Sequence, residues 1–220
     1  MVSTPIGNLR DVTYRAVEVL RDVQYIACED TRVTLKLLNS YGIKKPLISY
    51  HSKSSDAVVT RIEKLVAGGN DVALVTDSGT PGVSDPGNEL VARILEHGFE
   101  VVPVPGPSAV HTALVGAGIC YARYTFLGFL SAKKSRRRRR LDALKDRDTV
   151  FVIFESPHRI VGFLADLLDI CGNVSVYVAK EMTKRFEKYY RGSLSDVREQ
   201  IVADGVKGEY TIVVDNRHQK

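Results

Sequence analysis

The sequence DVALVTDSGTPGVSDPG, residues 71–87, joins a short apolar run to a loop rich in glycine and proline. The apolar run is typical of a buried strand, and the loop that follows it has the composition of a turn. Glycine lets a backbone approach a ligand closely, and proline stiffens the loop around it. This stretch therefore predicts a strand in an α/β sheet with a loop at its carboxyl end that is suited to a ligand.

Two further loops share this character, TPIGNL at residues 4–9 and VPGPSA at residues 104–109. Only residues 1–3 precede the first of them, which leaves its strand almost no length. A single loop of this kind is most often a plain turn. In open α/β sheets, however, ligands bind outside the carboxyl ends of the strands, and three such loops at one sheet edge favour a ligand site.

Short apolar runs alternate with amphipathic stretches of helical length along the whole chain. This alternation predicts an α/β fold with mainly parallel sheets. We expect strands at residues 23–27, 71–75, 100–104, 149–154, 173–179 and 209–214, and helices at residues 14–20, 57–66, 89–96, 160–168 and 196–202. The Gly-Ala-Gly of residues 116–118 predicts the end of a helix and a boundary between two αβα domains, 1–118 and 119–220.

Three pairs of residues have the spacing of helix starts. Ser84 and Ser156 each stand shortly before a proline, Pro86 and Pro157, which predicts a capping side chain followed by a first-turn proline. Ser193 with an aspartate three residues later resembles a capping box.

Composition excludes several classes of protein. The chain has 220 residues, 44% of them apolar and 26% charged, which is ordinary for a globular protein. The sequence has no apolar run of spanning length, no signal peptide, and three widely spaced cysteines, so we expect a cytoplasmic protein that does not associate with membranes. It also lacks a P-loop, a dinucleotide-binding glycine motif and a histidine pair spaced for a metal.

The net charge of +5 comes from one segment. Residues 133–140 read KKSRRRRR, and without these seven cations the chain has 24 basic and 26 acidic residues. Such runs are commonly one solvated helix face, but five consecutive arginines surround a helix and leave no side to bury. The segment predicts contact with a polyanion, through side chains suited to phosphate. These are Lys133, Lys134, Arg136, Arg137, Arg138, Arg139 and Arg140.

Several strings together resemble the tetrapyrrole methylase superfamily of S-adenosylmethionine (SAM) methyltransferases, and most of all its ribosomal RNA small subunit methyltransferase I branch. In the first half these are STPIGNL (3–9), EDTR (29–32), the loop 77–87 and VPGPS (104–108). In the second half they are FLGFL (126–130), FESPHR (154–159), EMTK (181–184) with Glu187, and GEY (208–210). The strings run through nearly the whole chain in the order typical of that branch.

The resemblance implies a methyltransferase with two αβα domains and SAM in the cleft between them, acting as a homodimer without a metal. The implied reaction is transfer of a methyl group to the ribose 2′-hydroxyl of a cytidine in the decoding centre of 16S rRNA, within the small ribosomal subunit. Carried over position by position, the implied SAM-binding residues are Pro5, Asp77, Gly79, Thr80, Val83, Ser84, Ser108, Ala109, Phe154, Glu155 and Tyr210.

Four polar residues of these strings are candidates for catalysis, because a ribose hydroxyl needs a base or a group that stabilises the developing alkoxide. They form two pairs, Asp30 with Arg32 and Glu181 with Lys184. Each has an ordinary alternative. The first pair has the composition of a structural ion pair, and the second that of a solvated charge pair, on one helix face only if the segment is helical.

Two other functions remain open at this point. A C-methyltransferase of the corrin or sirohaem pathways acts on substrates with many carboxylates, which the arginines also suit. A non-catalytic RNA-binding relative would keep the cleft without turnover. The strings at residues 29–32, 155–159 and 181–184 resemble the RNA branch and favour it over the C-methyltransferase. Failure to retain SAM, or retention of SAM without transfer to any RNA, would favour the non-catalytic relative.

Overall fold

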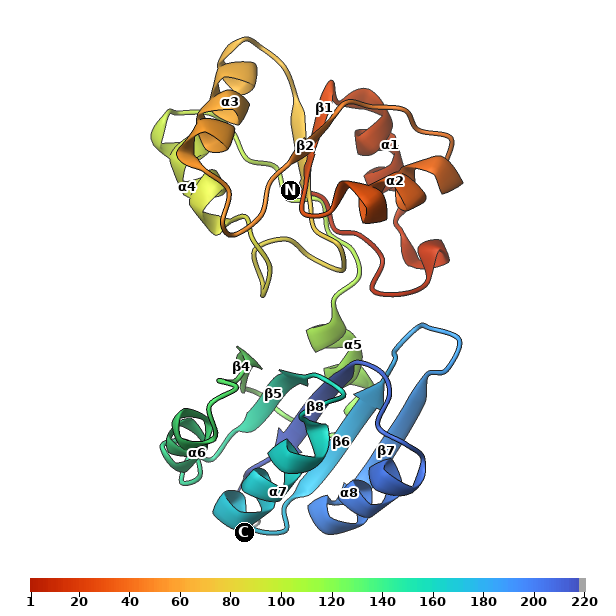
Figure 1. Ribbon diagram of the computed structural model, residues 1–220, viewed down its shortest axis with the longest axis vertical. Coiled ribbons are helices and arrows are strands. Elements are labelled where there is room, and N and C mark those ends of the chain that lie inside the picture. Colours follow the sequence, from red (N-terminus) through yellow and green to blue (C-terminus); the bar gives the residue numbers. More distant parts are fainter. Residues whose placement is uncertain (218–220) are drawn as a thin grey trace. The chain divides into compact units, whose positions relative to one another are not determined.

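The computed structural model describes residues 1–217 and contains two compact units, Met1–Ser108 (unit 1) and Ala109–Lys220 (unit 2) (Figure 1). The boundary expected after residue 118 places the helix that ends before Gly118 in the first half. The structure places this helix, Ala109–Ala117, in unit 2, because it packs against two strands of the second sheet. Local turn signals mark where a helix ends, but they do not show which core the helix joins.

Unit 1 is built on a parallel three-stranded sheet, in the order β2-β1-β3. Its strands are short apolar runs, which suits strands that helices cover on both faces. The elements of unit 1 are a 3-10 helix Leu9–Asp11, α1 Tyr14–Asp22, β1 Tyr25–Cys28, α2 Thr31–Ser40, β2 Leu47–Ser49, α3 Asp56–Ala67, β3 Val72–Val75 and α4 Asn88–Glu96.

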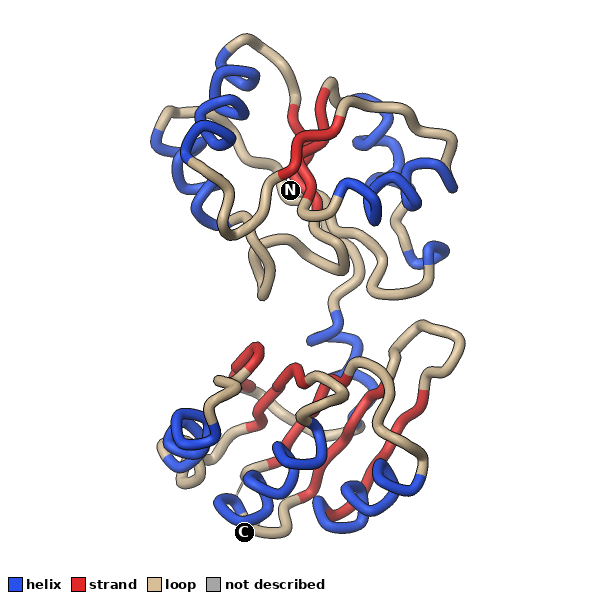
Figure 2. The backbone as a smooth tube through the Cα atoms, in the orientation of Figure 1, coloured by secondary structure: helices blue, strands red, loops and turns tan. Residues whose placement is uncertain are grey.

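Helices cover both faces of this sheet, with α1 and α2 on one side and α3 and α4 on the other (Figure 2). Alternation along β3 explains the arrangement, since successive side chains of a strand point to opposite faces. Ala73 and Val75 pack with Leu20 and Leu38 of α1 and α2, whereas Leu74 packs on α3 and α4. Unit 1 is therefore an αβα unit, as the sequence predicts.

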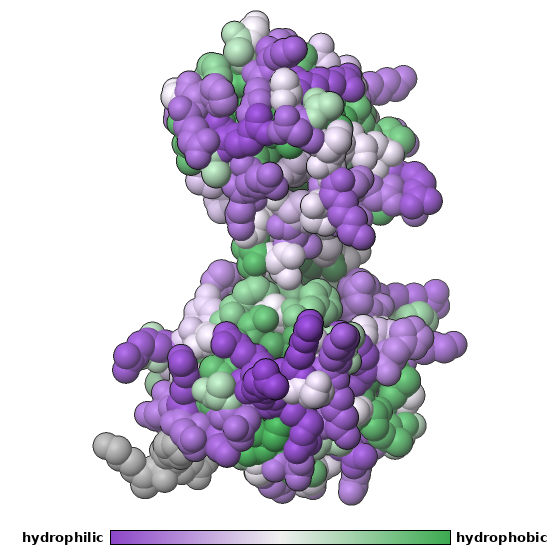
Figure 3. All heavy atoms as spheres, turned by 60° about the vertical axis from the view of Figure 1, so that its left-hand side comes forward, coloured by the Kyte–Doolittle hydropathy of each residue, from purple (hydrophilic) through white to green (hydrophobic). Residues whose placement is uncertain are grey.

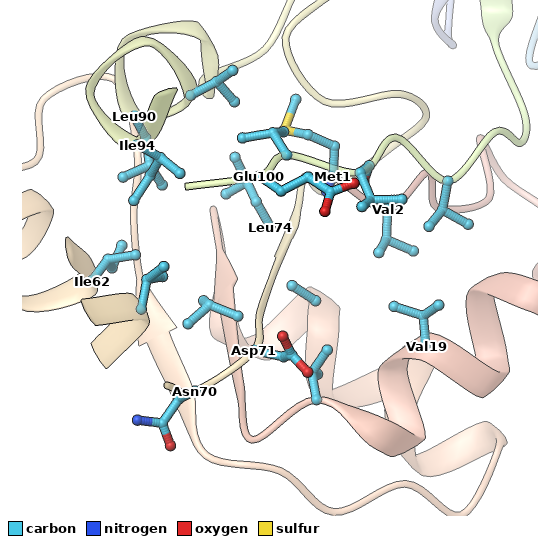
Figure 4. Close-up of a pocket in the computed structure, with 18 of the residues that line it drawn as sticks. Met1, Val2, Val19, Ile62, Asn70, Asp71, Leu74, Leu90, Ile94 and Glu100 are labelled. Atoms are coloured by element: carbon cyan, nitrogen blue, oxygen red, sulfur yellow. The ribbon is translucent and has the colours of Figure 1, made fainter. Parts of the chain in front are cut away.

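The strand expected at residues 100–104 does not form. This segment makes a single parallel bridge, Val104 with Val2, because the backbone beside it is only the short segment that ends in the first loop. Next to it lies a cavity of about 370 Å³ at the amino end of β3 (Figure 4). Its lining is mainly apolar and contains none of the residues predicted to bind SAM, so we do not assign the ligand site to it.

Unit 2 has a five-stranded sheet in the order β4-β5-β8-β6-β7. Only β4 and β5 are parallel, and the other neighbouring strands are antiparallel, so the expectation of mainly parallel sheets is wrong for this unit. The elements of unit 2 are α5 Ala109–Ala117, β4 Tyr124–Phe129, α6 Lys134–Asp142, β5 Val150–Glu155, α7 Ile160–Cys171, β6 Ser175–Lys180, β7 Lys188–Ser193, α8 Leu194–Ala203 and β8 Tyr210–Asp215.

Helices also lie on both faces of the second sheet, with α7 and α8 on one face and α5 on the other (Figure 1). The main core of unit 2 joins Phe163 of α7 and Ile201 of α8 to side chains of β5, β6 and β8. On the opposite face α5 approaches very closely, because a Cβ at Gly116 would lie 2.5 Å from the Tyr177 hydroxyl. The α/β class with two αβα units is thus confirmed.

The helix starts agree with the sequence at one position of three. The Ser193 hydroxyl accepts a hydrogen bond from the Asp196 amide at 3.3 Å and caps α8, as predicted. The other two predictions are wrong, since α4 begins after Gly87 and α7 begins after Arg159. In both cases the proline lies in a turn before the helix, which the same residue types also favour.

Candidate active site

Hydrogen bonds join the three glycine–proline loops of unit 1 to one another. The Thr4 amide donates to the Gly79 carbonyl at 2.9 Å, and the Gly79 amide donates back to the Thr4 carbonyl at 3.2 Å. The Thr80 hydroxyl donates to the Pro107 carbonyl at 3.1 Å and lies 3.1 Å from the Ser3 hydroxyl. The structure therefore brings together the parts of the chain that carry Pro5, Thr80 and Ser108.

Two glycines allow this close approach. Gly79 has φ +85°, and a Cβ there would lie 3.3 Å from Cγ2 of Ile6. A Cβ at Gly106 would lie 2.8 Å from Cβ of Ser3, a separation that side chains do not tolerate. These positions need glycine because the loops are in backbone contact. Val83 and Ser84 lie farther along the same loop and are exposed.

Carboxylates gather where β1 and β3 end, at the residues after β1 and in the loop of residues 77–87. An oxygen of Asp77 accepts a hydrogen bond from the Asp30 amide at 3.0 Å. Burial, followed by the charges of Glu29 and Asp77, raises the pKa of Asp85 to about 6. Burial and the charge of Asp77 also raise the pKa of Glu29. Asp85 was missed from the sequence because its place between a serine and a proline fits a helix cap equally well.

Asp30 and Arg32 form an ion pair beside these carboxylates. The Arg32 side chain donates through Nε and Nη2 to the two oxygens of Asp30, at 3.0 and 2.6 Å. Asp30 also caps α2 by accepting from the Arg32 amide at 2.8 Å. These hydrogen bonds lower the pKa of Asp30 to about 2. A carboxylate with so low a pKa is a poor proton acceptor near neutral pH, and the geometry agrees with the structural alternative for this pair.

The predicted residues of unit 2 meet at one edge of its sheet. Since β4, β5 and β6 run in the same direction, their carboxyl ends lie together with the starts of β7 and β8. Glu155, the last residue of β5, pairs with Tyr210, the first of β8, and Tyr210 also pairs with Lys180 at the end of β6. The second-half strings of the family are therefore placed along this edge.

The side chains of Glu155 and Tyr210 point into unit 2. The Glu155 carboxylate is 0% exposed and accepts hydrogen bonds from the Ser156 amide at 2.8 Å and from Arg159 at 2.9 Å. Tyr210 belongs to the main core. Phe154 is half-buried, with its ring 5.0 Å from that of Phe126. Phe154 is thus the only one of these three side chains that is not buried.

Glu181 and Lys184 form a compact ion cluster with Glu209. The Lys184 ammonium lies 3.1 Å from a Glu181 oxygen and 2.8 Å from a Glu209 oxygen. Burial alone would lower the pKa of Lys184, but the hydrogen bonds that its ammonium donates to these two carboxylates raise it, so the amine stays protonated. The segment is a loop and not a helix, because Glu181 and Thr183 have φ of 51° and 64°. A Cβ at Gly208 would lie 2.6 Å from Cγ of Glu181, so glycine is required beside the cluster.

The basic segment forms α6, and the expectation that none of its sides is buried is wrong. Arg137 is buried and donates through Nε to Asp166 of α7 at 2.9 Å. Arg138 donates to the other Asp166 oxygen at 3.1 Å and also pairs with Asp169. Arg137 and Arg138 therefore hold α6 on α7, and the exposed Lys134 also pairs with Asp166, at 3.8 Å. The five exposed cations of the segment are Lys133, Lys134, Arg136, Arg139 and Arg140.

Figure 3 shows a face of unit 2 on which hydrophilic side chains gather around apolar ones. Within residues 1–217 no group of three or more His, Cys, Asp or Glu side chains is arranged to hold a metal ion. In the same part of the chain, no helix has both the length and the apolar character needed to cross a membrane.

Two of the solved structures that share this fold are described as methyltransferases of precorrin and uroporphyrin substrates. A cobalt precorrin-4 methyltransferase of cobalamin biosynthesis aligns with 97% of this chain and 92% of its own, with a TM-score of 0.71 and 17% identity. A uroporphyrin-III-C-methyltransferase from Thermus thermophilus aligns with 97% of this chain and 91% of its own, with a TM-score of 0.66 and 18% identity. At these identities the likeness shows the fold alone.

Sequence relatives are much more similar. Residues 1–198 match the family described as Tetrapyrrole (Corrin/Porphyrin) Methylases. The chain is 40% identical over 220 residues to the ribosomal RNA small subunit methyltransferase I of Halalkalibacterium halodurans, covering 100% of this chain and 76% of that protein. It is 43% identical over 217 residues to the protein of the same name from Thermotoga maritima, covering 99% and 97%. The chain is therefore a methyltransferase that belongs to the tetrapyrrole methylase family and, within it, to the ribosomal RNA small subunit methyltransferase I branch.

Proposed function

We propose that this protein transfers a methyl group from SAM to the ribose 2′-hydroxyl of a cytidine in 16S rRNA, within the small ribosomal subunit. The observation that carries the proposal is its identity of about 40% over the full chain with relatives named for small-subunit rRNA methylation. We also propose that it works in the cytoplasm as a homodimer, as the branch implies.

The loops of unit 1 suit the cofactor. Backbone contact between the loops at Gly79 and Gly106 leaves main-chain amides and carbonyls near Thr80 and Ser108, the groups that fix a small ligand in a concave site. Asp77, Pro5, Val83, Ser84 and, in unit 2, Ala109 and Phe154 complete the proposed SAM-binding set. When bound, SAM supplies an activated methyl group on a positively charged sulfur.

The protein itself has to align the ribose hydroxyl, to exclude water and to accept the proton that this hydroxyl loses when its oxygen is methylated. We assign Lys184 to the electrostatic part, because its ammonium stays charged and Glu181 and Glu209 fix its position. An ammonium group held in this way stabilises a developing alkoxide. Asp85 is the carboxyl group whose pKa of about 6 suits proton acceptance. Asp30 serves to cap α2, and the Arg32 side chain holds Asp30 in place through their ion pair.

The RNA backbone is bound, we propose, by the exposed cations of α6. Phosphate contacts supply most of the affinity of such interfaces and make it sensitive to salt. Arg136, Arg139 and Arg140 are exposed and are available to phosphates, whereas Arg137 and Arg138 are held by aspartates of α7.

One experiment tests the proposal as a whole. The protein is incubated with radiolabelled SAM and either undermethylated small subunits, deproteinised 16S rRNA or a precorrin, and the label is located by nuclease digestion and mass spectrometry. We expect a 2′-O-methylcytidine in the rRNA of the first or second sample. Label in the precorrin alone would replace the proposal with tetrapyrrole C-methylation, and RNA binding without any transfer would indicate a non-catalytic relative.

A further inference from the structure

The loop between β6 and β7, residues 181–187, is a rigid hairpin tip at the site edge of unit 2. Two of its residues, Glu181 and Thr183, have positive φ, a strained conformation that persists only where the surroundings enforce it. The surroundings do so here. The Glu181 amide donates to the Glu209 carbonyl at 2.9 Å, and the Thr183 amide donates to the Glu187 carboxylate at 2.8 Å.

The base of the hairpin is also fixed. Lys180 and Lys188, the last residue of β6 and the first of β7, both reach the turn that follows α8. The Lys180 ammonium donates to the Gly205 carbonyl at 2.6 Å, and Lys188 pairs with Asp204. Two of the cations in this region are therefore neutralised or engaged within the protein.

The acidic side chains around the tip are engaged in the same way. Glu187 accepts hydrogen bonds from the Thr183 amide and from the Tyr189 hydroxyl, the latter at 3.1 Å. Glu181 and Glu209 both hold Lys184. Each of these three carboxylates thus has a hydrogen-bond partner within the protein, and Glu181 and Glu209 share the charge of Lys184, whereas Glu187 is held by neutral donors only.

Three exposed side chains remain at one surface cavity beside the tip, Arg185, Phe186 and Lys207. Phe186 is 73% exposed, and the Arg185 guanidinium lies 5.4 Å from the centre of its ring. Within residues 1–217 neither Arg185 nor Lys207 forms an ion pair. A planar apolar ring is therefore held out to solvent on a rigid loop, with the Arg185 cation beside it and a second cation, Lys207, in the lining of the same cavity.

We infer that this tip binds a single-stranded segment of RNA, with one unpaired base stacked on Phe186 and the adjacent phosphates on Arg185 and Lys207. Aromatic rings stack on any base, and flanking cations follow the phosphate backbone, which is how proteins hold single strands. The edge position supports this assignment, because Lys184 lies in the same loop and α6 follows β4 at the same edge. The inference rests on the proposed function and gives its RNA substrate a second contact, separate from α6.

The test uses the absence of tryptophan from the chain. A Phe186→Trp variant carries a single tryptophan at the tip, whose emission a stacked base quenches. Titration with a ten-nucleotide oligocytidine should quench this emission with the same dissociation constant that fluorescence anisotropy of the labelled oligonucleotide gives. Absence of quenching while the labelled RNA binds would overturn the inference.

Affinity measurements on other variants give a second readout. Phe186→Ala should weaken oligocytidine binding about tenfold, and Phe186→Tyr should restore it, because only an aromatic ring stacks. Lys207→Gln should lower the slope of log affinity against log salt by about 0.7, the value for one phosphate contact to a single strand. Arg123→Gln, an exposed cation just before β4 at the opposite edge of the sheet, is the matched control and should leave both unchanged.

The failure of this inference is distinguishable from the failure of the proposed function. In one outcome the Phe186→Ala protein binds RNA within twofold of the unchanged protein, while replacement of Arg136, Arg139 and Arg140 of α6 with glutamine weakens binding. The tip then does not contact RNA, and the proposed function stands. If Phe186→Ala instead dissociates a dimer without affecting RNA affinity, the tip is a protein interface and the inference is wrong. If the unchanged protein neither binds nor methylates RNA, both fail.

Discussion

The Arg137 guanidinium and the Asp166 carboxylate form an ion pair in which both side chains are almost fully buried, 8% and 4% exposed. One residue comes from the basic run of α6 and the other from α7, 29 positions later. Because Arg138 also reaches Asp166, a single buried aspartate holds two consecutive arginines of the run. The pair therefore positions α6 while Arg136, Arg139 and Arg140 stay exposed to solvent.

Removal of the buried aspartate should destabilise unit 2 strongly. In the Asp166→Ala variant Arg137 keeps a buried charge without its partner, which costs about 3–5 kcal/mol in comparable sites. Asp169→Ala is the matched control, because Asp169 pairs with Arg138 at the surface, and it should cost less than about 1 kcal/mol. Urea unfolding measures both. Equal small losses would mean that the buried pair does not anchor α6.

Neutralisation of exposed α6 cations should weaken RNA binding through its salt dependence. Replacing Arg136, Arg139 and Arg140 with glutamine should make the log–log salt slope shallower by roughly 2.1 to 2.7, at about 0.7 to 0.9 for each of the three lost phosphate contacts. SAM affinity measured by calorimetry should not change. The matched control replaces three exposed cations of unit 1, Arg15, Arg61 and Lys64, with glutamine. A slope that responds equally to both triple variants would contradict a specific role for α6.

The sequence predicts a helix or strand where the residues of that segment alone are enough to form it, without a partner from elsewhere in the chain. The apolar run ending at Val75 forms β3 because both of its faces are covered, and Ser193 caps α8 by a contact three residues away. Strand β7 was not predicted, because Lys188 and Arg191 make a polar edge strand that only its pairing with β6 reveals. Residues 100–104 have strand composition, but a strand also needs a neighbour, and only Val2 supplies one there.

The features of the candidate site also fall into two groups, those that the local sequence predicts and those that depend on residues distant in the sequence. Composition predicts loops that approach a ligand, and the hydrogen bond from Thr80 to the Pro107 carbonyl agrees with that prediction. A charge run does not reveal a partner 29 residues away, so the burial of Arg137 could not be foreseen. The raised pKa of Asp85 likewise depends on burial and on Glu29 and Asp77, which are distant in sequence.

Asp85 should lower the stability of unit 1 at neutral pH. Its pKa of about 6 in the folded protein lies above the unfolded value of 3.8, so the folded state binds more protons between these values and stability falls as pH rises through them. Asp85→Asn should therefore raise the free energy of unfolding at pH 7 by about 1 kcal/mol, after allowance for solvent screening of a half-exposed group. The gain should vanish below about pH 4. Urea unfolding at pH 4, 5, 6 and 7 tests this.

The same substitution should lower methyl transfer if Asp85 accepts the proton. A more stable but slower enzyme is the expected outcome, since functional sites often retain groups that cost stability. Initial rates with labelled SAM measure it, and calorimetry checks that SAM still binds. A stabilised variant with full turnover would remove Asp85 from the mechanism and leave only its effect on stability.

Lys184 should be needed for turnover more than for cofactor binding. We expect Lys184→Ala to lower kcat by about 100-fold, the usual effect of removing one group that stabilises an oxyanion, while the SAM dissociation constant stays near that of the unchanged protein. Arg32→Ala tests the competing pair, and the exposed ion pair with Asp30 predicts a much smaller effect. Lys145→Ala, which removes another lysine from an ion pair three residues apart, is the control. Full turnover in Lys184→Ala would eliminate this assignment.

Gly106 should be essential for SAM binding although it carries no functional group. A Cβ at this position would lie 2.8 Å from Cβ of Ser3, so Gly106→Ala must push apart the first and third loops of unit 1. We expect at least about a tenfold loss of SAM affinity by calorimetry, since a displaced loop misplaces several backbone contacts at once. Gly162→Ala in α7 makes the same chemical change where no atom lies within 4 Å, and it should leave SAM affinity unchanged. Equal affinity in the two variants would show that SAM does not depend on the contact between these loops, and the proposed site would have to be moved.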